Sequence, residues 1–289
     1  LTEQRYSTSF TGEEFFLADH EVTLGGSGPR KVLPGVAYLE MARAAIEAAL
    51  PERPEGASVA LRDNAWAQPV VFPDTREVHV ALATRDDDQV DYEVYSLADG
   101  EEIVHCQGRA VLGRDPAPSR LDVGQLDRRM IQGSASAESV YLASARSGVA
   151  YGPSFRGIAE VHRGTGELLA RLRLPAEVER TLGSYVLHPS LMDAALQACV
   201  ALLGEPDVRR PRLPFAVEEL RIVAPCTAEM VAWIRYARHS QATDPVAKVD
   251  IDLCDAVGNV CAQLRGLSTR EMTWQRQAPG ALLAVPVWE

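Results

Sequence analysis

The fold of this chain is decided by the stretch His188-Pro189-Ser190-Leu191-Met192-Asp193-Ala194-Ala195-Leu196-Gln197, which has an earlier counterpart in Leu33-Pro34-Gly35-Val36-Ala37-Tyr38-Leu39-Glu40-Met41-Ala42. In both stretches a proline precedes an apolar run, and proline suits the first turn of a helix, where its missing N–H costs nothing. His20 lies just upstream of the first helix, and Asp193 lies inside the second. A histidine and a carboxyl group placed in this way indicate one acid/base site divided between two related halves.

The sequence around these helices also repeats. The segment Val104-His105-Cys106-Gln107-Gly108-Arg109 matches Val260-Cys261-Ala262-Gln263-Leu264-Arg265, with an offset of 156 residues from Arg109 to Arg265. The offset from Pro34 to Pro189 is 155 residues. Because two separate landmarks give nearly the same offset, we interpret the chain as an internal duplication.

Each half is predicted to be one buried helix followed by an antiparallel meander, which makes the fold class α+β. The predicted helices, residues 35–50 and 190–203, are apolar around most of their circumference, so a sheet should wrap each of them. Alternating apolar segments predict the strands. They are residues 58–62, 70–72, 78–83, 90–97 and 103–112 in the first half, and 217–223, 230–237, 247–254 and 259–269 in the second.

We divide the chain into four parts. Residues 1–115 form the half that carries His20, residues 116–150 form a linker with a short helix at 137–146, and residues 151–273 form the half that carries Asp193. The segment 113–136 is rich in Asp, Arg, Pro and Gly, which is typical of a linker. The polar tail 274–289 is interpreted as a second linker, and the chain, which starts without Met, as a piece of a longer protein.

The composition is that of an ordinary globular protein, with 289 residues, 46% apolar and 24% charged. A net charge of −11 argues against nucleic acid or an anionic membrane surface as a partner. No apolar run approaches the ~18 residues of a membrane span, and we recognise no signal peptide. The five cysteines form no CxxC pair, so we expect reduced thiols in a cytoplasmic protein.

The residues near the two helix starts suit proton transfer. Gly35 leaves backbone N–H groups free at the positive end of a helix, where they can stabilise a carbonyl oxygen that gains negative charge. A neutral His20 can remove a proton from the neighbouring carbon, and Asp193, kept protonated by an apolar pocket, can protonate a leaving hydroxyl. Gln197, one turn further, can give the buried carboxyl its hydrogen-bond partner.

These parts suit the removal of water from a 3-hydroxyacyl compound. Structural roles stay open as alternatives at this point: a histidine near a helix is often structural, and an acidic residue near a helix start also favours the helix dipole. His188 is interpreted as a cap or core residue, and the other four histidines (His79, His105, His162 and His239) as structural or exposed. The charged run at 85–88 is expected at a solvated hairpin tip.

Four motifs follow one another along the chain. They are Phe16-Leu17-Ala18-Asp19-His20 with Val32–Met41, then Tyr151-Gly152-Pro153-Ser154-Phe155-Arg156-Gly157, then His188–Gln197, and then Leu213-Pro214-Phe215. In this order, and over about residues 13–272, they resemble the dehydratase domains of modular polyketide synthases. The second motif resembles the YGPxFxG signature of that family, and the first and third resemble its catalytic-histidine and catalytic-aspartate motifs.

The resemblance implies a double hot-dog fold, with two helices each wrapped by an antiparallel sheet. It implies an enzyme that dehydrates a 3-hydroxyacyl chain, carried as a thioester on an acyl carrier protein, to the 2,3-enoyl thioester during polyketide elongation. By carry-over, His20 would be the base at the alpha carbon, and Asp193 would protonate the departing hydroxyl.

Further roles follow from the same resemblance. Gln197 and Tyr151 would orient Asp193 or the hydroxyl, and Gly35 would offer its N–H to the thioester carbonyl. Pro34 would shape the turn into the helix. Phe155 would line the acyl tunnel. No metal and no organic cofactor is expected, since the substrate is carried on the phosphopantetheine of the carrier protein.

The expected partners are the acyl carrier protein and neighbouring synthase domains. The terminal Val285-Pro286-Val287-Trp288-Glu289 resembles the opening of a following ketoreductase region. The resemblance also leaves a homodimer open.

One departure from the family pattern lies after the histidine. The usual motif, His-x3-Gly-x4-Pro, places the proline nine positions after the histidine, whereas Pro34 follows His20 by fourteen. The segment Gly25-Gly26-Ser27-Gly28-Pro29-Arg30 therefore holds about five extra residues. Its glycines suit a flexible loop beside the expected site. The loop is either a harmless surface insertion or a sign of an altered substrate entrance or an altered reaction.

Three alternatives to simple dehydration stay open. A dehydratase with the same pair could also close an oxygen ring by oxa-Michael addition or shift a double bond. A catalytically silent scaffold that docks the carrier protein is disfavoured by the presence of both His20 and Asp193. A hot-dog thioesterase would need a water-activating carboxylate, to which no further motif points.

Overall fold

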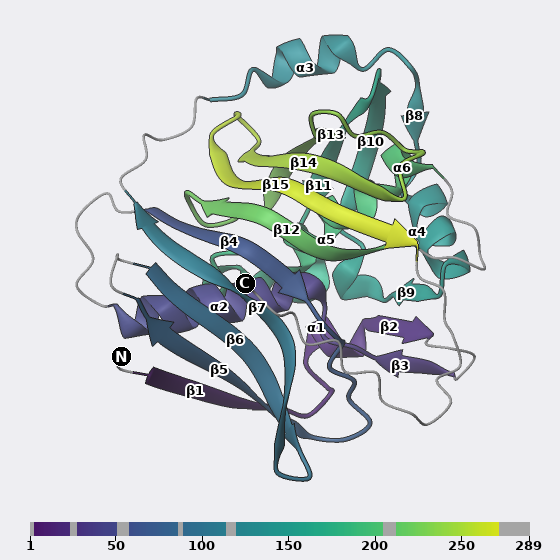
Figure 1. The fold of residues 1–289 in the computed structure, drawn as a ribbon. Helices are drawn as coiled ribbons and strands as arrows, with labels where there is room; N and C mark the ends of the chain where they lie inside the picture. Colours follow the sequence, from purple (N-terminus) through teal and green to yellow (C-terminus); the bar gives the residue numbers. More distant parts are fainter. Residues whose placement is uncertain are drawn as a thin grey trace.

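A single antiparallel sheet of 12 strands forms the frame of the molecule (Figure 1). The computed structural model describes residues 3–23, 28–50, 58–85, 89–113, 120–204 and 212–271. In order across the sheet the strands are β1 (Glu3–Phe10), β5 (Arg76–Thr84), β6 (Gln89–Ala98), β7 (Glu101–Gly113), β4 (Ser58–Trp66), β12 (Arg212–Ile222), β15 (Val260–Glu271), β14 (Val246–Asp255), β13 (Glu229–Tyr236), β11 (Glu167–Arg173), β10 (Ile158–Gly164) and β8 (Ser134–Ala135).

The order of the strands confirms the duplication as a feature of the fold. The run β5-β6-β7-β4 in the first half has its counterpart in β13-β14-β15-β12 in the second, and the two runs meet where β4 pairs with β12. At this junction Leu61 lies opposite Leu220, and both side chains are fully buried. The two expected sheets are therefore joined edge to edge into one, over a shared apolar core.

One helix in each half lies against this sheet, as the double hot-dog fold requires (Figure 1). They are α2 (Gly35–Ala49) and α5 (Pro189–Ala198), which contact each other. The predicted second helix ran to residue 203 without interruption, but the structure breaks it. At Cys199 the N–H bonds to the Leu196 carbonyl, three residues back, and a short α6 (Val200–Leu203) follows.

The strand predictions were incomplete before each helix. Strand β1 precedes α2, and β10 and β11 precede α5; none of the three was predicted. The predicted strand at 70–72 was wrong, because only Val71 makes an isolated bridge, to Val32. Pro69 and Pro73 flank that segment and have no N–H to donate to a ladder, although Val70 is buried as a strand residue would be.

A second sheet, of three strands, joins the two halves beside the helix starts. Its order is β3 (Pro29–Lys31), β2 (His20–Thr23) and β9 (Val149–Tyr151), so a strand of the first half pairs with one from the start of the second. The short α1 (Phe15–Ala18) leads into β2, and the 3-10 turn η1 (Pro153–Phe155) follows β9. This small sheet brings the histidine motif and the Tyr151–Gly157 motif together.

Part of the predicted linker is folded. It contains α3 (Val123–Arg129) and β8, and α4 (Ala137–Arg146) follows at the predicted place. Leu126 and Met130 pack on the outer face of the second half, against Leu169 and Val231, so α3 covers that face (Figure 1). The predicted tail 274–289 lies outside the described residues.

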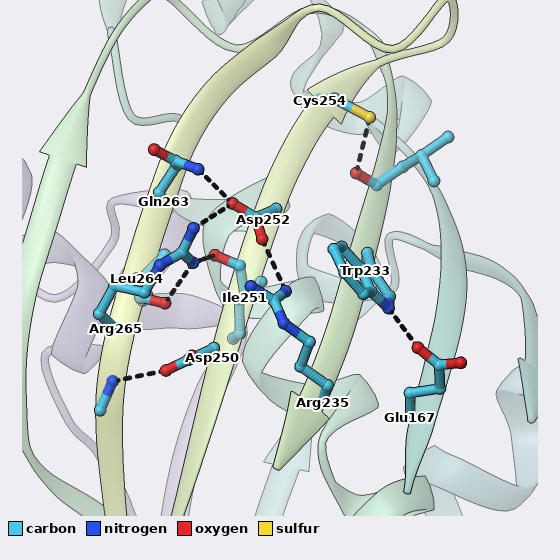
Figure 2. Close-up of polar contacts among 12 residues, drawn as sticks. Glu167, Trp233, Arg235, Asp250, Ile251, Asp252, Cys254, Gln263, Leu264 and Arg265 are labelled. Atoms are coloured by element: carbon cyan, nitrogen blue, oxygen red, sulfur yellow. Dashed lines mark hydrogen bonds and ion pairs between the residues drawn. The ribbon is translucent and has the colours of Figure 1, made fainter. Parts of the chain in front are cut away.

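The arginines that marked the repeat make the same contact in both halves. Arg109 on β7 bonds Asp91 on β6 at 2.9 Å, and Arg265 on β15 bonds Asp252 on β14 at 2.6 Å. Figure 2 shows the second cluster, in which Arg235 also pairs with Asp252. Burial raises the pKa of Asp252, but the bonds to its cationic neighbours outweigh this and hold that pKa below its usual value. The repeat thus reflects an Asp–Arg pair between equivalent strands.

None of the described helices is by itself long and apolar enough to cross a membrane. Only the pair Ala176–Ser184 and Pro189–Leu203, bent by 116°, passes that test of length and composition when taken together.

Candidate active site

His20 begins β2, lies opposite Tyr151 of β9, and is 8% exposed. Its Nδ1 is 2.8 Å from the carbonyl oxygen of Val32. A carbonyl only accepts hydrogen bonds, so Nδ1 carries the proton and donates it. Nε2 of the neutral ring is then unprotonated, which is the state that a general base requires.

Strands β2 and β3, which lie on either side of residues 24–28, pair with each other antiparallel. The pairs Glu21–Lys31 and Thr23–Pro29 fix the register of the two strands. Next to these pairs the N–H of Val32 donates to the His20 carbonyl at 3.2 Å. The histidine is therefore held at the start of α2 despite the wider spacing to Pro34. Residues 24–27, which include most of the predicted glycine loop, lie outside the described residues.

Asp193 lies on α5 with 5% of its surface exposed. The Nε2 of Gln197 donates to its Oδ2 at 2.7 Å and to the carbonyl of Phe155 at 3.1 Å. Burial raises the pKa of Asp193; the bond from Gln197, and the charge of His20 when that ring is protonated, lower it only in part. The carboxyl group is thus biased towards the protonated form, as a general acid requires.

Tyr151 and Phe155 form an aromatic wall beside the histidine. Their rings stack with centroids 6.4 Å apart and an interplanar angle of 8°. The His20 ring lies 5.7 Å from the Tyr151 ring and 5.8 Å from the Phe155 ring. Desolvation and the nearby Asp193 raise the pKa of Tyr151 well above its usual value, so its phenol keeps the proton and can donate it in a hydrogen bond.

Gly35 is the first residue of α2, and Pro34 is the cap before it. The N–H of Gly35 belongs to the first turn and has no acceptor within the helix. The indole Nε1 of Trp66 donates to the Gly35 carbonyl at 3.0 Å, and the Trp66 ring would lie 3.4 Å from a Cβ at that position. Trp66 therefore covers one side of the helix start.

The sequence motifs assigned no role to three residues of the site region, which are Asp19, Trp66 and Glu40. Asp19 accepts the Ser154 N–H at 2.8 Å through Oδ2, and its own carbonyl accepts the Gly152 N–H at 2.9 Å. Its place next to His20 within a quoted motif was the available signal. Trp66 and Glu40, by contrast, act through contacts with other segments that no local pattern announces.

His188 is the N-cap of α5 and is fully buried, in agreement with its interpretation as a cap or core residue. The Thr181 hydroxyl donates to the Val178 carbonyl at 2.6 Å, so its oxygen must accept from His188 Nε2 at 2.9 Å. Nδ1 in turn accepts the Ser190 N–H at 3.3 Å. Burial lowers the pKa of His188 to about 4, which keeps the ring neutral.

The structure thus brings together His20, Asp193, Gln197, Tyr151 and Phe155, with Gly35 at the neighbouring helix start. Within the described part of the chain, no group of three His, Cys, Asp or Glu side chains could hold a metal ion. The fold and the site define a double hot-dog protein with a histidine and a buried carboxyl group of raised pKa at the interface of its halves.

Comparison with known proteins agrees with this class. The family model described as "Polyketide synthase dehydratase N-terminal domain" matches residues 123–279, and that described as "Polyketide synthase dehydratase domain" matches residues 1–97. The chain therefore belongs to the polyketide synthase dehydratase family, which confirms the resemblance inferred from the motifs.

Relatives and solved structures support the same assignment. The chain is 36% identical to polyketide synthase PksM of Bacillus subtilis (strain 168), in an alignment that covers 100% of this chain. It is 40% identical to PksN of the same organism, in an alignment that covers 93% of this chain. It spans 7% and 5% of those two proteins. A trans-AT polyketide synthase dehydratase domain from Brevibacillus brevis has a similar crystal structure. The TM-score is 0.86 at 41% identity, covering 93% of this chain and 94% of that one.

Proposed function

We propose that the chain removes water from a 3-hydroxyacyl thioester on an acyl carrier protein and yields the 2,3-enoyl thioester during polyketide elongation. The observation that carries the proposal is the pairing, at one interface, of a histidine whose Nδ1 faces a carbonyl with a buried carboxyl group of raised pKa. His20 offers an unprotonated Nε2, and Asp193 has a pKa raised by burial. Membership of the dehydratase family supports the reaction class.

In this mechanism His20 Nε2 takes the proton from the alpha carbon. The electron pair of that C–H bond forms the double bond as the bond from the beta carbon to the hydroxyl breaks. Asp193 gives its proton to the leaving oxygen, which departs as water. The N–H of Gly35 stabilises the negative charge that gathers on the thioester oxygen. Returning one proton from His20 to Asp193, directly or through solvent, restores both groups.

The neighbouring residues have orienting roles in the same proposal. Gln197 holds the Asp193 carboxyl through Oδ2, which leaves Oδ1 for the substrate. Tyr151 donates its hydroxyl proton towards the substrate oxygen, and Phe155 lines the path of the acyl chain. Pro34 fixes the entry into the helix whose N–H is used. Both proton transfers come from side chains, so the reaction needs no metal and no organic cofactor.

We also propose that the chain works as one domain of a larger synthase. The support is its small share of the relatives' length together with its match to the two dehydratase models over residues 1–97 and 123–279. Its partners are then a carrier protein bearing the phosphopantetheine thioester and adjacent synthase domains. Within the chain, residues 1–115 and 151–273 form the two halves, with 116–150 between them.

The direct test incubates the purified domain with a series of 3-hydroxyacyl pantetheine thioesters and determines the product structure. We expect a 2,3-enoyl thioester; a cyclic ether or a shifted alkene would instead support the alternative reactions. His20→Ala and Asp193→Asn should each lower turnover by at least ~100-fold, the scale of general acid/base help. His162→Ala, at a partly exposed histidine that pairs with Glu160 on β10, serves as the control. Near wild-type turnover in His20→Ala or in Asp193→Asn would refute the catalytic role proposed for the residue replaced.

A further inference from the structure

The starts of the two buried helices are linked by one carboxylate, that of Glu40. It lies on α2 and is 6% exposed. Its Oε1 accepts the Val186 N–H at 3.0 Å, and its Oε2 accepts the Leu187 N–H at 3.0 Å. A side chain of the first half thereby binds the backbone of the second half immediately before α5.

The carboxylate of Glu40 is further oriented from its own helix. Arg43 donates to Oε2 through Nε at 2.8 Å and to Oε1 through Nη2 at 3.0 Å. A bidentate arginine fixes the plane of a carboxylate as well as its position. The Glu40 carboxylate thus accepts two bonds from the Arg43 guanidinium and two from backbone N–H groups. All four bonds can form in only one orientation of the carboxylate.

Both ends of this link lead directly to the candidate site. Gly35 lies five residues before Glu40 on the same helix, and Leu187 is followed by the cap His188 and then by α5, which carries Asp193. The Val186 carbonyl also accepts the Cys226 N–H at 2.9 Å, so this segment is held from both sides. Movement at residues 186–187 would therefore shift Asp193 relative to Gly35 and His20.

We propose that Glu40 is a positioning residue that sets the distance between the acid on α5 and the base and N–H donor of the first half. The proposal rests on the proposed dehydration. A displacement of about 1 Å between reacting groups can lower turnover by about 100-fold without loss of substrate binding. Loss of Glu40 is thus expected to act on kcat more than on KM.

A pocket beside Glu40 makes this role testable by chemical rescue. It has a volume of about 360 Å³, and Glu40, Tyr185 and Pro189 are among the residues that line it. In Glu40→Ala a small carboxylate such as formate can enter the vacated space. There it can accept from the Val186 and Leu187 N–H groups and pair with Arg43.

The experiment compares the wild type with Glu40→Ala, Glu40→Gln and Glu47→Ala on one 3-hydroxyacyl pantetheine thioester. For Glu40→Ala we expect kcat to fall by about 10- to 100-fold with KM within about threefold, and formate to restore much of the loss. Glu47 is an exposed partner of Arg43, so Glu47→Ala is the matched control and should retain wild-type kcat. Unchanged kcat in Glu40→Ala, or a loss that formate does not reduce, would overturn the proposal.

Glu40→Gln covers the case in which Glu40→Ala does not fold, because glutamine keeps the shape but offers one acceptor in place of two. Its kcat should fall at unchanged KM, and wild-type kcat would count against the proposal. Hydrogen exchange at the Val186 and Leu187 amides tests the contact without any substrate. Exchange should quicken in Glu40→Ala and slow again with formate, whereas equal exchange in wild type and variant would contradict the link. An inactive wild type with the expected exchange would refute the dehydration alone.

Discussion

At the scale of single residues, the chemistry depends on which groups carry protons. The Val32 carbonyl fixes the tautomer of His20, and burial keeps Asp193 protonated to higher pH than an ordinary aspartate. The proposed mechanism requires an unprotonated Nε2 on His20 and a protonated carboxyl group on Asp193. Turnover should fall on the alkaline side, as Asp193 loses its proton.

Gln197→Leu should move the alkaline limb of the pH profile. The bond from Gln197 lowers the pKa of Asp193, because it favours the charged carboxylate. Without that bond the pKa rises further, so the alkaline limb should shift to higher pH while kcat falls through poorer orientation. The measurement is kcat/KM against pH for the wild type and for Gln197→Leu. An alkaline limb that stays in place or moves to lower pH would contradict the assignment of Asp193 as the acid.

His188 should make stability depend on pH. Its folded pKa of about 4 lies below the unfolded value of 6.5, so the unfolded chain binds more protons between these values. Stability should therefore decrease as pH falls below about 6.5 and stop changing from this cause below about 4. In His188→Asn the free energy of unfolding, measured with urea, should vary less with pH between pH 4 and 7 than in the wild type. His162→Asn is the control and should keep the wild-type dependence. An unaltered slope in His188→Asn would show that the buried ring does not cause it.

At the scale of elements, the aromatic wall is fixed by the packing of η1 on α1. Asp19 binds the backbone of Gly152 and Ser154, and no room is left for a side chain at Gly152. A Cβ there would lie 2.1 Å from Asp19 Oδ1. Tyr151 and Phe155, on either side of this contact, take their positions from it.

Gly152→Ala should therefore destabilise the protein by about 1–3 kcal/mol through overpacking. An Asp19→Ala background removes the two nearest atoms, Oδ1 and Cγ, and leaves only the Cβ of residue 19 at 2.7 Å, so the same change should cost less. Urea unfolding of the wild type, both single variants and the double variant measures this coupling. Strictly additive effects would show that Asp19 and Gly152 do not compete for the same space.

The sequence predicted those elements that have a local pattern. Each buried helix begins at or just after a proline and consists of an apolar run, and the four central strands of each half alternate between apolar and polar residues. Both kinds of element were therefore predicted. Strand β11 was missed because its sequence, Glu167-Leu168-Leu169-Ala170-Arg171-Leu172-Arg173, is buried on both faces over most of its length and does not alternate. In the site, motifs pointed to His20 and Asp193, whereas Glu40 and Trp66 act through partners far away in sequence.

At the scale of the whole molecule, the duplication leaves one complete site. At the offset of 155 residues between Pro34 and Pro189, the position of Asp193 corresponds to Tyr38 and that of Gln197 to Ala42. Tyr38 is 2% exposed and its hydroxyl accepts the Val70 N–H at 2.9 Å, a structural role. In the proposed mechanism the first half thus supplies the base and the N–H donor, and the second half supplies the acid.

The joined sheet predicts that the two halves unfold together. Leu220 is fully buried at the junction of β12 with β4, so Leu220→Ala should destabilise the whole domain by about 2–5 kcal/mol. Hydrogen exchange should then quicken to a similar degree in β6 of the first half and β14 of the second. Faster exchange confined to β14 would show that the halves unfold independently.

The most direct measurement is mass spectrometry of a 3-hydroxyacyl pantetheine thioester incubated with the wild type and with Asp193→Asn. The roles of His20 and Asp193 predict that the wild type converts the substrate to a product lighter by one water. Asp193→Asn, which keeps the shape but cannot donate a carboxyl proton, should leave the substrate unchanged over the same time. A wild type that releases no water from any chain length, or an Asp193→Asn variant that releases it at the wild-type rate, would contradict this.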